Sequence, residues 1–125
     1  MLKMPRCVDK TKSEFCRLDD FINYMEQNFK IKKANVSKFL MLLAYNDFTN
    51  FYIFYNEKEI QNKLFSLIIF DSDDDDGNER MSFSFYKAKN NKVKVTFSSL
   101  YEELSLDEIR DITVNLRTLS GILCN

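Results

Sequence analysis

The residues with the clearest chemical potential are acidic side chains crowded into one short segment between two apolar runs. The segment spans residues 71–79, and its carboxylates belong to Asp71, Asp73, Asp74, Asp75, Asp76 and Glu79. Carboxylates at this density repel one another, so they are stable in water or beside a positive charge. The segment therefore predicts an acidic loop that either stays solvated or contacts a cation or a basic protein surface.

A calcium site is the most specific of these alternatives, and the residue spacing does not support it. An EF-hand loop places a glycine at its sixth position and a bidentate Glu at its twelfth. With Gly77 in the sixth position, Asp74 and Asp76 occupy ligand positions, but Ser72 stands first and Phe83 stands twelfth. We therefore predict no metal site and no cofactor.

A second group combines aromatic and basic side chains near one predicted hairpin. Its members are Tyr86, Lys87, Lys89, Lys92 and Lys94. Sheet faces of this composition can stack on the bases and clamp the backbone of single-stranded nucleic acid. The alternative interpretation is that lysines on a solvent-facing sheet keep the protein soluble.

The residues that are missing limit the chemistry further. The chain has no histidine and two glycines, Gly77 and Gly121. Histidine is the commonest general base, and clustered glycines form the loops that hold phosphate. We therefore expect a protein that is not an enzyme. Cys7, Cys16 and Cys124 have no C-x-x-C spacing and follow no apolar signal segment, which predicts free thiols and a cytoplasmic location.

Three helices are expected around these groups. Apolar residues at helical spacing, behind a capping box at Thr11–Glu14, predict a first helix over about residues 13–29. Asn35 can cap a second helix, which is apolar nearly all round and is therefore expected to be central. Ser105 begins another capping box, and Gly121 is well placed to end the C-terminal helix.

Four strands are expected between the second and third helices, over residues 48–55, 64–70, 81–85 and 92–97. The last two alternate apolar and polar residues. A three-residue loop that ends at Asn91, with Asn91 left-handed, would close this hairpin. That loop pairs Phe85 with Val95. Phe83 then pairs with Phe97, so both apolar sets share one face of the sheet.

These elements predict one α+β domain. It has two N-terminal helices, a four-stranded mostly antiparallel sheet, and a C-terminal helix packed on one sheet face. The domain is expected over residues 13–125, after a loose basic leader over residues 1–12. The longest strongly apolar run, residues 39–45, is far shorter than the roughly 20 residues that cross a bilayer, so no membrane contact is expected.

The charge is distributed unevenly along the chain. The formal net charge is −1, which argues against a strongly basic nucleic-acid binder. Residues 1–40 carry nine Lys or Arg and five Asp or Glu, whereas residues 71–125 carry seven and eleven. We therefore expect a molecule with one basic end and one acidic end.

The sequence favours a non-catalytic protein-binding module. The leading hypothesis is a stoichiometric inhibitor of the immunity or antitoxin kind, monomeric or dimeric, that docks a basic partner. Its contact would comprise the carboxylates of residues 71–79, widened by Glu102 and Glu103. One alternative is a secretion-type chaperone, which would bind an effector protein through apolar surface. Another is single-stranded nucleic-acid binding through the Lys-rich hairpin.

Overall fold

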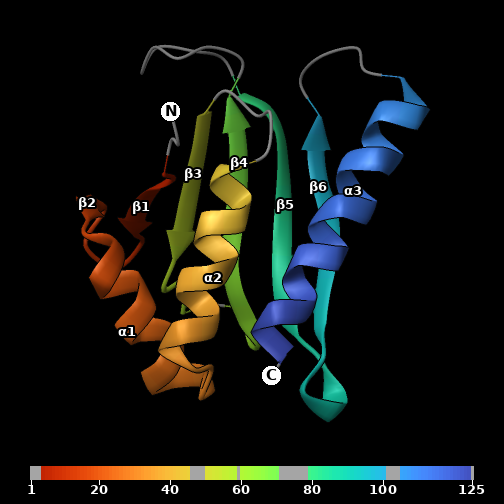
Figure 1. Cartoon of the computed structure of the whole chain (residues 1–125). Helices are drawn as coiled ribbons and strands as arrows, with labels where there is room; N and C mark the ends of the chain where they lie inside the picture. Colours follow the sequence, from red (N-terminus) through yellow and green to blue (C-terminus); the bar gives the residue numbers. More distant parts are fainter. Residues whose placement is uncertain (1–3, 46–49, 59, 71–78, 101–104, 125) are drawn as a thin grey trace.

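The computed structural model describes residues 4–45, 50–58, 60–70, 79–100 and 105–124 (Figure 1). The fold is α+β, as expected: two helices follow a short hairpin, and a C-terminal helix packs against a six-stranded mixed sheet. In chain order the elements are β1 (Arg6–Asp9), β2 (Glu14–Cys16), α1 (Leu18–Phe29), α2 (Lys33–Ala44), β3 (Asn50–Tyr55), β4 (Lys63–Phe70), β5 (Glu79–Lys87), the 3₁₀ turn η1 (Lys89–Asn91), β6 (Val93–Leu100), α3 (Leu106–Ser120) and the 3₁₀ turn η2 (Gly121–Cys124).

The four expected strands are β3 to β6, and β1 and β2 are additional. The strand order is β2-β1-β3-β4-β5-β6, with β1 and β3 parallel and every other pair antiparallel. The leader expected over residues 1–12 is instead a strand from Arg6 to Asp9. The spacing from Phe15 to Leu18 fits a helix, so Phe15 was assigned to the first helix. In the structure Phe15 pairs with Val8, and the β1–β2 hairpin therefore includes both segments.

The first capping box was also assigned wrongly. The Thr11–Glu14 segment turns the β1–β2 hairpin, where Ser13 has a φ of 53° and donates its N–H to the Asp9 carbonyl at 2.8 Å. Helix α1 begins at Leu18 rather than at residue 13. The Asp20 carboxylate accepts a hydrogen bond from the Arg17 N–H at 3.2 Å and so satisfies a donor at the true helix start.

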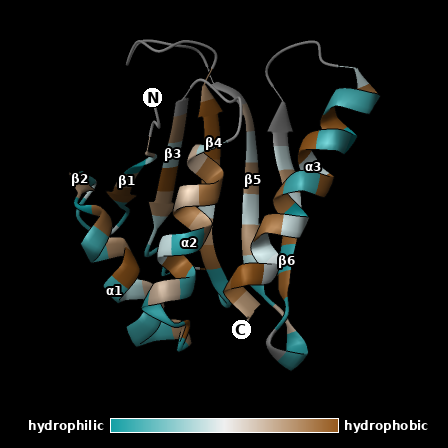
Figure 2. Ribbon diagram, viewed as in Figure 1, coloured by the Kyte–Doolittle hydropathy of each residue, from teal (hydrophilic) through white to brown (hydrophobic). Residues whose placement is uncertain are grey.

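All three helices cover the same face of the sheet (Figure 1). Helix α2 lies centrally, as predicted, and its buried residues share one face: Val36, Phe39, Leu40, Leu43 and Ala44. Helices α1 and α3 are amphipathic, with alternating hydrophobic and hydrophilic stretches (Figure 2). The rings of Phe65 and Phe85 stack at 4.4 Å, and Phe21 and Phe39 approach Phe65 at 5.4 and 5.8 Å. These contacts between helices and strands form the core.

The predicted register of the β5–β6 hairpin is confirmed. Phe85 pairs with Val95 and Phe83 pairs with Phe97, and the Ala88 N–H donates to the Lys92 carbonyl at 2.7 Å across a three-residue loop. The left-handed residue was predicted wrongly. It is Asn90, with φ 63° and ψ 33°, and not Asn91. Asparagine tolerates this conformation at either position, so residue type alone could not select one.

The opposite side of the sheet carries no helix among the residues that the structure describes, and we call it the open face. Alternation along the strands places on it side chains such as Arg6 and Val8 from β1, Phe15 from β2, and Tyr52 and Phe54 from β3. Serines, threonine and lysine follow on β4 to β6. The sheet thus has one face that carries the helices and one that does not, as expected of a largely antiparallel sheet.

Candidate functional site

The acidic segments were the leading candidate contact, and most of their residues lie outside the described part of the chain. These are Asp71, Asp73, Asp74, Asp75, Asp76, Glu102 and Glu103. Glu79 begins β5, but its side chain is not described. The strand residues that flank these segments pair in the sheet: Phe70 pairs with Glu79, and Met81 pairs with Leu100. Both acidic segments therefore connect to the same end of three adjacent strands.

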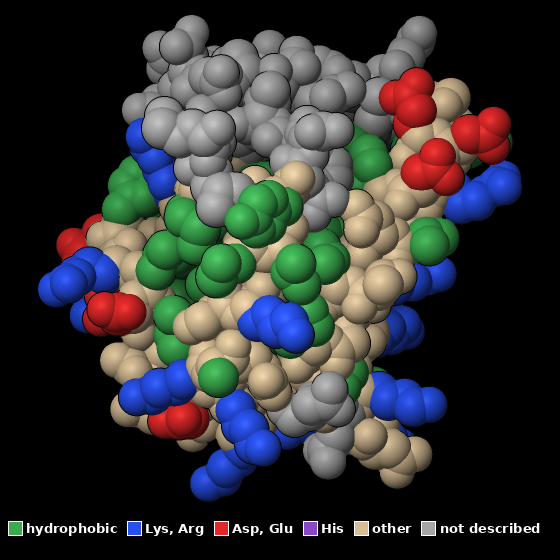
Figure 3. Space-filling model, viewed as in Figure 1, with side chains coloured by type: hydrophobic (Ala, Val, Ile, Leu, Met, Phe, Trp, Pro, Cys, Tyr) green, Lys and Arg blue, Asp and Glu red, His purple; other side chains and the backbone are tan. Residues whose placement is uncertain are grey.

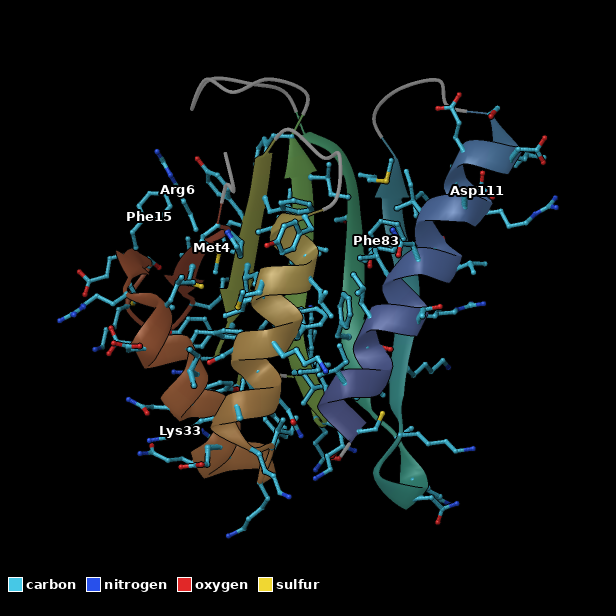
Figure 4. All side chains as sticks on the ribbon, in the orientation of Figure 1. Met4, Arg6, Phe15, Lys33, Phe83 and Asp111 are labelled. Atoms are coloured by element: carbon cyan, nitrogen blue, oxygen red, sulfur yellow. The ribbon has the colours of Figure 1, made fainter. Side chains whose placement is uncertain are left out.

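The described carboxylates at this end belong to the first turns of α3. They are Asp107, Glu108 and Asp111, which are exposed (Figure 3). The Ser105 hydroxyl accepts the Glu108 N–H at 3.1 Å, and this cap fixes where the helix starts. Carboxylates near a helix N-terminus are stabilised by the unpaired N–H groups and the helix dipole. Figure 4 shows Asp111 directed away from the sheet, toward solvent.

One ion pair joins described side chains of this cluster, and it leaves the carboxylates available to a partner. Asp107 lies 3.5 Å from Arg110, and both side chains are mostly in water. Exposed pairs of this kind contribute only about 0–1 kcal/mol, so a binding partner can replace them at little cost. Lysine and arginine side chains concentrate toward the other end of the helix-covered face (Figure 3).

The Lys-rich hairpin is divided between the two faces of the sheet. Tyr86 pairs directly with Lys94 on the open face, and Lys89 and Lys92 are exposed at the loop. Lys87 was grouped with them wrongly, because it lies on the helix-covered face. Its Nζ donates to the Phe29 carbonyl at 2.8 Å and satisfies an acceptor at the end of α1.

A polar cleft of about 490 Å³, the Asp9 cleft, lies between the β1–β2 hairpin, α1 and the turn after β3. Its best-defined group is the Asp9 carboxylate, which is 7% exposed. One oxygen, Oδ1, accepts the Thr11 N–H at 2.9 Å, the Thr11 hydroxyl at 2.6 Å and the Asn56 amide at 3.1 Å. Sequence reasoning missed this cluster; the Asp-x-Thr spacing was its local signal.

The protonation states in the Asp9 cleft follow from these contacts. Burial by itself would raise the pKa of Asp9, but the hydrogen bonds from Thr11 and Asn56 and the charge of Lys12 hold it below its ordinary value. Burial raises the pKa of Tyr24 and that of Tyr55, whose rings lie 5.0 Å apart. The cleft therefore holds an ionised carboxylate beside two neutral phenols at neutral pH.

The cysteines are free thiols. Cys7 and Cys16 face each other across β1 and β2, and burial together with the nearby Cys16 raises the pKa of Cys7 to about 12. Cys124 approaches the Ser120 carbonyl at 3.6 Å near the C-terminal end of the chain. A thiol with a raised pKa is a poor nucleophile, so Cys7 packs as a small apolar residue.

Within the described ranges, no group of three or more Cys, Asp or Glu side chains could hold a metal ion. Of the helices described, none is long and apolar enough to cross a membrane. Comparisons of the chain with protein-family models, with curated proteins and with solved structures found no match. The functional argument therefore depends on the surfaces of this molecule.

Proposed function

We propose that the protein is a non-catalytic module that docks a basic surface of another protein through its acidic end. The observation that carries this proposal is the exposed cluster Asp107, Glu108 and Asp111 at the end of the sheet where both acidic segments connect. Concentrated charge of one sign accelerates association with an oppositely charged surface and discriminates against other partners.

A stoichiometric inhibitor is the form of this function that we favour. Enzymes that cleave nucleic acid carry basic clefts that grip phosphate, and a row of carboxylates on a stable domain can occupy such a cleft in place of phosphate. The free thiols of Cys7, Cys16 and Cys124 are compatible with an inhibitor that acts in the reducing environment of the cytoplasm.

The test is partner capture from the native host lysate with two neutralised variants. One replaces Asp73–Asp76 with Asn, and the other combines Asp107→Asn, Glu108→Gln and Asp111→Asn. We expect the wild-type protein to retain one basic partner that both variants lose, with retention falling as salt rises.

The matched control removes three exposed carboxylates elsewhere, by Glu14→Gln, Asp19→Asn and Glu26→Gln. It changes the net charge by the same amount as the α3 variant, so it separates a local contact from a general charge effect. A partner that binds the wild-type protein and all variants equally would exclude the acidic end as the contact.

A second candidate function, a chaperone for an effector protein, is favoured by apolar side chains on the outer surface of α2. Met41 is 48% exposed, and Tyr45, one helical turn later, is 63% exposed. Hydrophobic side chains gather over the upper part of α2 in Figure 3. If this surface binds the partner, Met41→Ser with Tyr45→Ser abolishes capture while the acidic-end variants retain it.

A further inference from the structure

Two cysteines stand opposite each other in the β1–β2 hairpin. Cys7 and Cys16 are paired residues of adjacent antiparallel strands. Residues paired in this way have Cα atoms about 4.5–5.5 Å apart and side chains on the same face of the sheet. Disulfide bonds join residues whose Cα atoms are about 4.4–6.8 Å apart. The backbone therefore holds these two residues in a register that a disulfide can bridge.

Both sulfur atoms lie on the helix-covered side of the sheet. Cys7 is 1% exposed and belongs to the hydrophobic core, whereas Cys16 packs against that core and stays partly exposed. Cys16 is close enough that its charge contributes to the raised pKa of Cys7. Cys124 belongs to η2, which packs against α2 and α3, away from this hairpin (Figure 1). The register thus selects one pair among three cysteines.

An oxidant can reach Cys16 through the Asp9 cleft, because Cys16 lines this cleft. Its sulfur approaches the Glu14 carbonyl at 3.6 Å and shares a side-chain hydrogen bond with Tyr55. The sulfur of Cys16 therefore faces polar space that is open to solvent, while that of Cys7 is enclosed. Oxidation of cysteine depends on exposure, so Cys16 is the residue that reacts first.

We propose that Cys7 and Cys16 are a redox-sensitive pair that hydrogen peroxide converts into a disulfide across the β1–β2 hairpin. Peroxide oxidises the Cys16 thiol to a sulfenic acid and releases one water. The Cys7 thiol then attacks the Cys16 sulfur and forms the S–S bond, while the sulfenic hydroxyl leaves with the Cys7 proton as a second water. The two thiols lose two electrons and the peroxide gains them. This inference does not depend on the proposed function.

The surroundings of Cys7 determine the order and the pace of these steps. Burial and the nearby Cys16 raise the pKa of Cys7 to about 12, so it carries little thiolate at neutral pH and reacts poorly with peroxide itself. A neutral sulfenic acid at Cys16 removes part of that cause, and the register keeps the oxidised sulfur opposite Cys7. We expect the second step to be the slower one.

The disulfide would change the hairpin and the Asp9 cleft together. β2 has three residues and is the edge strand beside β1 in the described sheet, so it is placed to open locally. A covalent bond to β1 would prevent that opening. The same bond would draw the Cys16 sulfur away from Tyr55 and from the wall of the cleft. Oxidation would therefore stabilise this edge of the sheet and alter the cleft.

The experiment treats the reduced full chain with hydrogen peroxide, denatures it and labels the remaining thiols with a maleimide. Intact mass counts the labels, peptide mapping identifies linked residues, and a nonreducing gel separates monomers from linked chains. We expect two of the three thiols to be lost in a monomer, and dithiothreitol to restore them.

Three variants separate the roles of the cysteines. Cys124→Ser is the matched control and should form the same disulfide as the wild-type protein. Cys16→Ser changes a partly exposed residue and should retain the Cys7 thiol. Cys7→Ala should stop at a sulfenic acid on Cys16, which dimedone traps.

A glutathione titration of Cys124→Ser tests whether the fold holds the pair in register. The ratio of reduced to oxidised glutathione that leaves half of the pair oxidised is measured for the folded protein and again in urea. We expect the fold to favour the disulfide by about tenfold to 100-fold. By linkage, the oxidised protein should then unfold at a higher temperature than the reduced protein.

Three results would overturn the proposal. One is retention of all three thiols under peroxide, or a wild-type protein that stops at the Cys16 sulfenic acid. Another is a disulfide that includes Cys124 or that joins two chains. The third is a folded protein that favours the disulfide no more than the protein in urea does, because the hairpin would then hold the two sulfur atoms apart.

Discussion

Replacing Asp9 with Asn is the sharpest perturbation of the hydrogen-bond network that joins the β1–β2 hairpin to the end of β3. The substitution preserves the shape of the side chain but removes its charge. All three hydrogen bonds accepted by Asp9 Oδ1, two from Thr11 and one from Asn56, would then end on a neutral amide oxygen. Hydrogen bonds to a charged group contribute about 1.5–3 kcal/mol each, against about 0.5–1.5 kcal/mol for neutral pairs.

The three bonds share one oxygen, so their losses do not add, and we expect the free energy of unfolding to fall by about 2 kcal/mol at neutral pH. The pKa of Asp9 lies below its ordinary value of 3.8 in the folded protein. The stabilisation is therefore fully present above about pH 4 and is lost as pH falls through the folded-state pKa. The difference between wild type and Asp9→Asn should be constant near neutrality and narrow in acid.

The assay is urea unfolding followed by circular dichroism over a series of pH values. Asp19→Asn removes an exposed carboxylate from α1 and should change the free energy of unfolding by no more than about 0.5 kcal/mol. A difference for Asp9→Asn no larger than that of the control, or one that grows as the pH falls, would refute the reasoning.

Four further predictions test the core, the hairpin and the helix ends by urea unfolding. Phe85→Ala removes a fully buried ring and should cost about 3–5 kcal/mol; a cost below about 1 kcal/mol would contradict the core described. Ser105→Ala should cost about 1 kcal/mol through loss of the α3 cap, whereas Ser105→Asp should retain most of that stability. Asn90→Gly should leave the free energy of unfolding unchanged or raise it by up to about 1 kcal/mol. A larger stabilisation by Asn91→Gly than by Asn90→Gly would contradict the loop geometry. Lys87→Met should cost about 1 kcal/mol by leaving the Phe29 carbonyl without its donor, and no change would contradict that contact.

The sequence predicted best where a regular pattern repeats over a whole element. Strict alternation in β5 and β6 determined which residues share a face, so the pairing of Phe85 with Val95 followed from parity alone. The same alternation places Lys87 with Phe83 and Phe85 on the covered face. Grouping Lys87 by charge with the exposed lysines overlooked this signal.

The first two strands and the hydrogen bonds around Asp9 could not be predicted, because they depend on contacts between residues that are distant in the sequence. β1 has four residues and β2 three, too few for a period to be recognised, and the residues of β3 that pair with β1 lie 46 positions later in the chain. The bond from Asn56 to Asp9 spans 47 positions. The contact between Phe15 and Tyr52 was missed for the same reason, because these two rings become neighbours only when β1 and β2 extend the sheet.

The small hairpin formed by β1 and β2 has a consequence for which strand lies at the edge of the sheet. β3 has the largely apolar sequence NFYIFY. Without β1, the backbone N–H and C=O groups along one side of β3 would be unpaired, and another chain could extend the sheet there. β1 and β2 move the edge outward to a strand of three residues, which is too short to template aggregation. The other edge, β6, has Lys94 within it and Lys92 just before it. Removing residues 1–16 should therefore produce a chain that self-associates through β3, with loss of solubility preceding any loss of secondary structure.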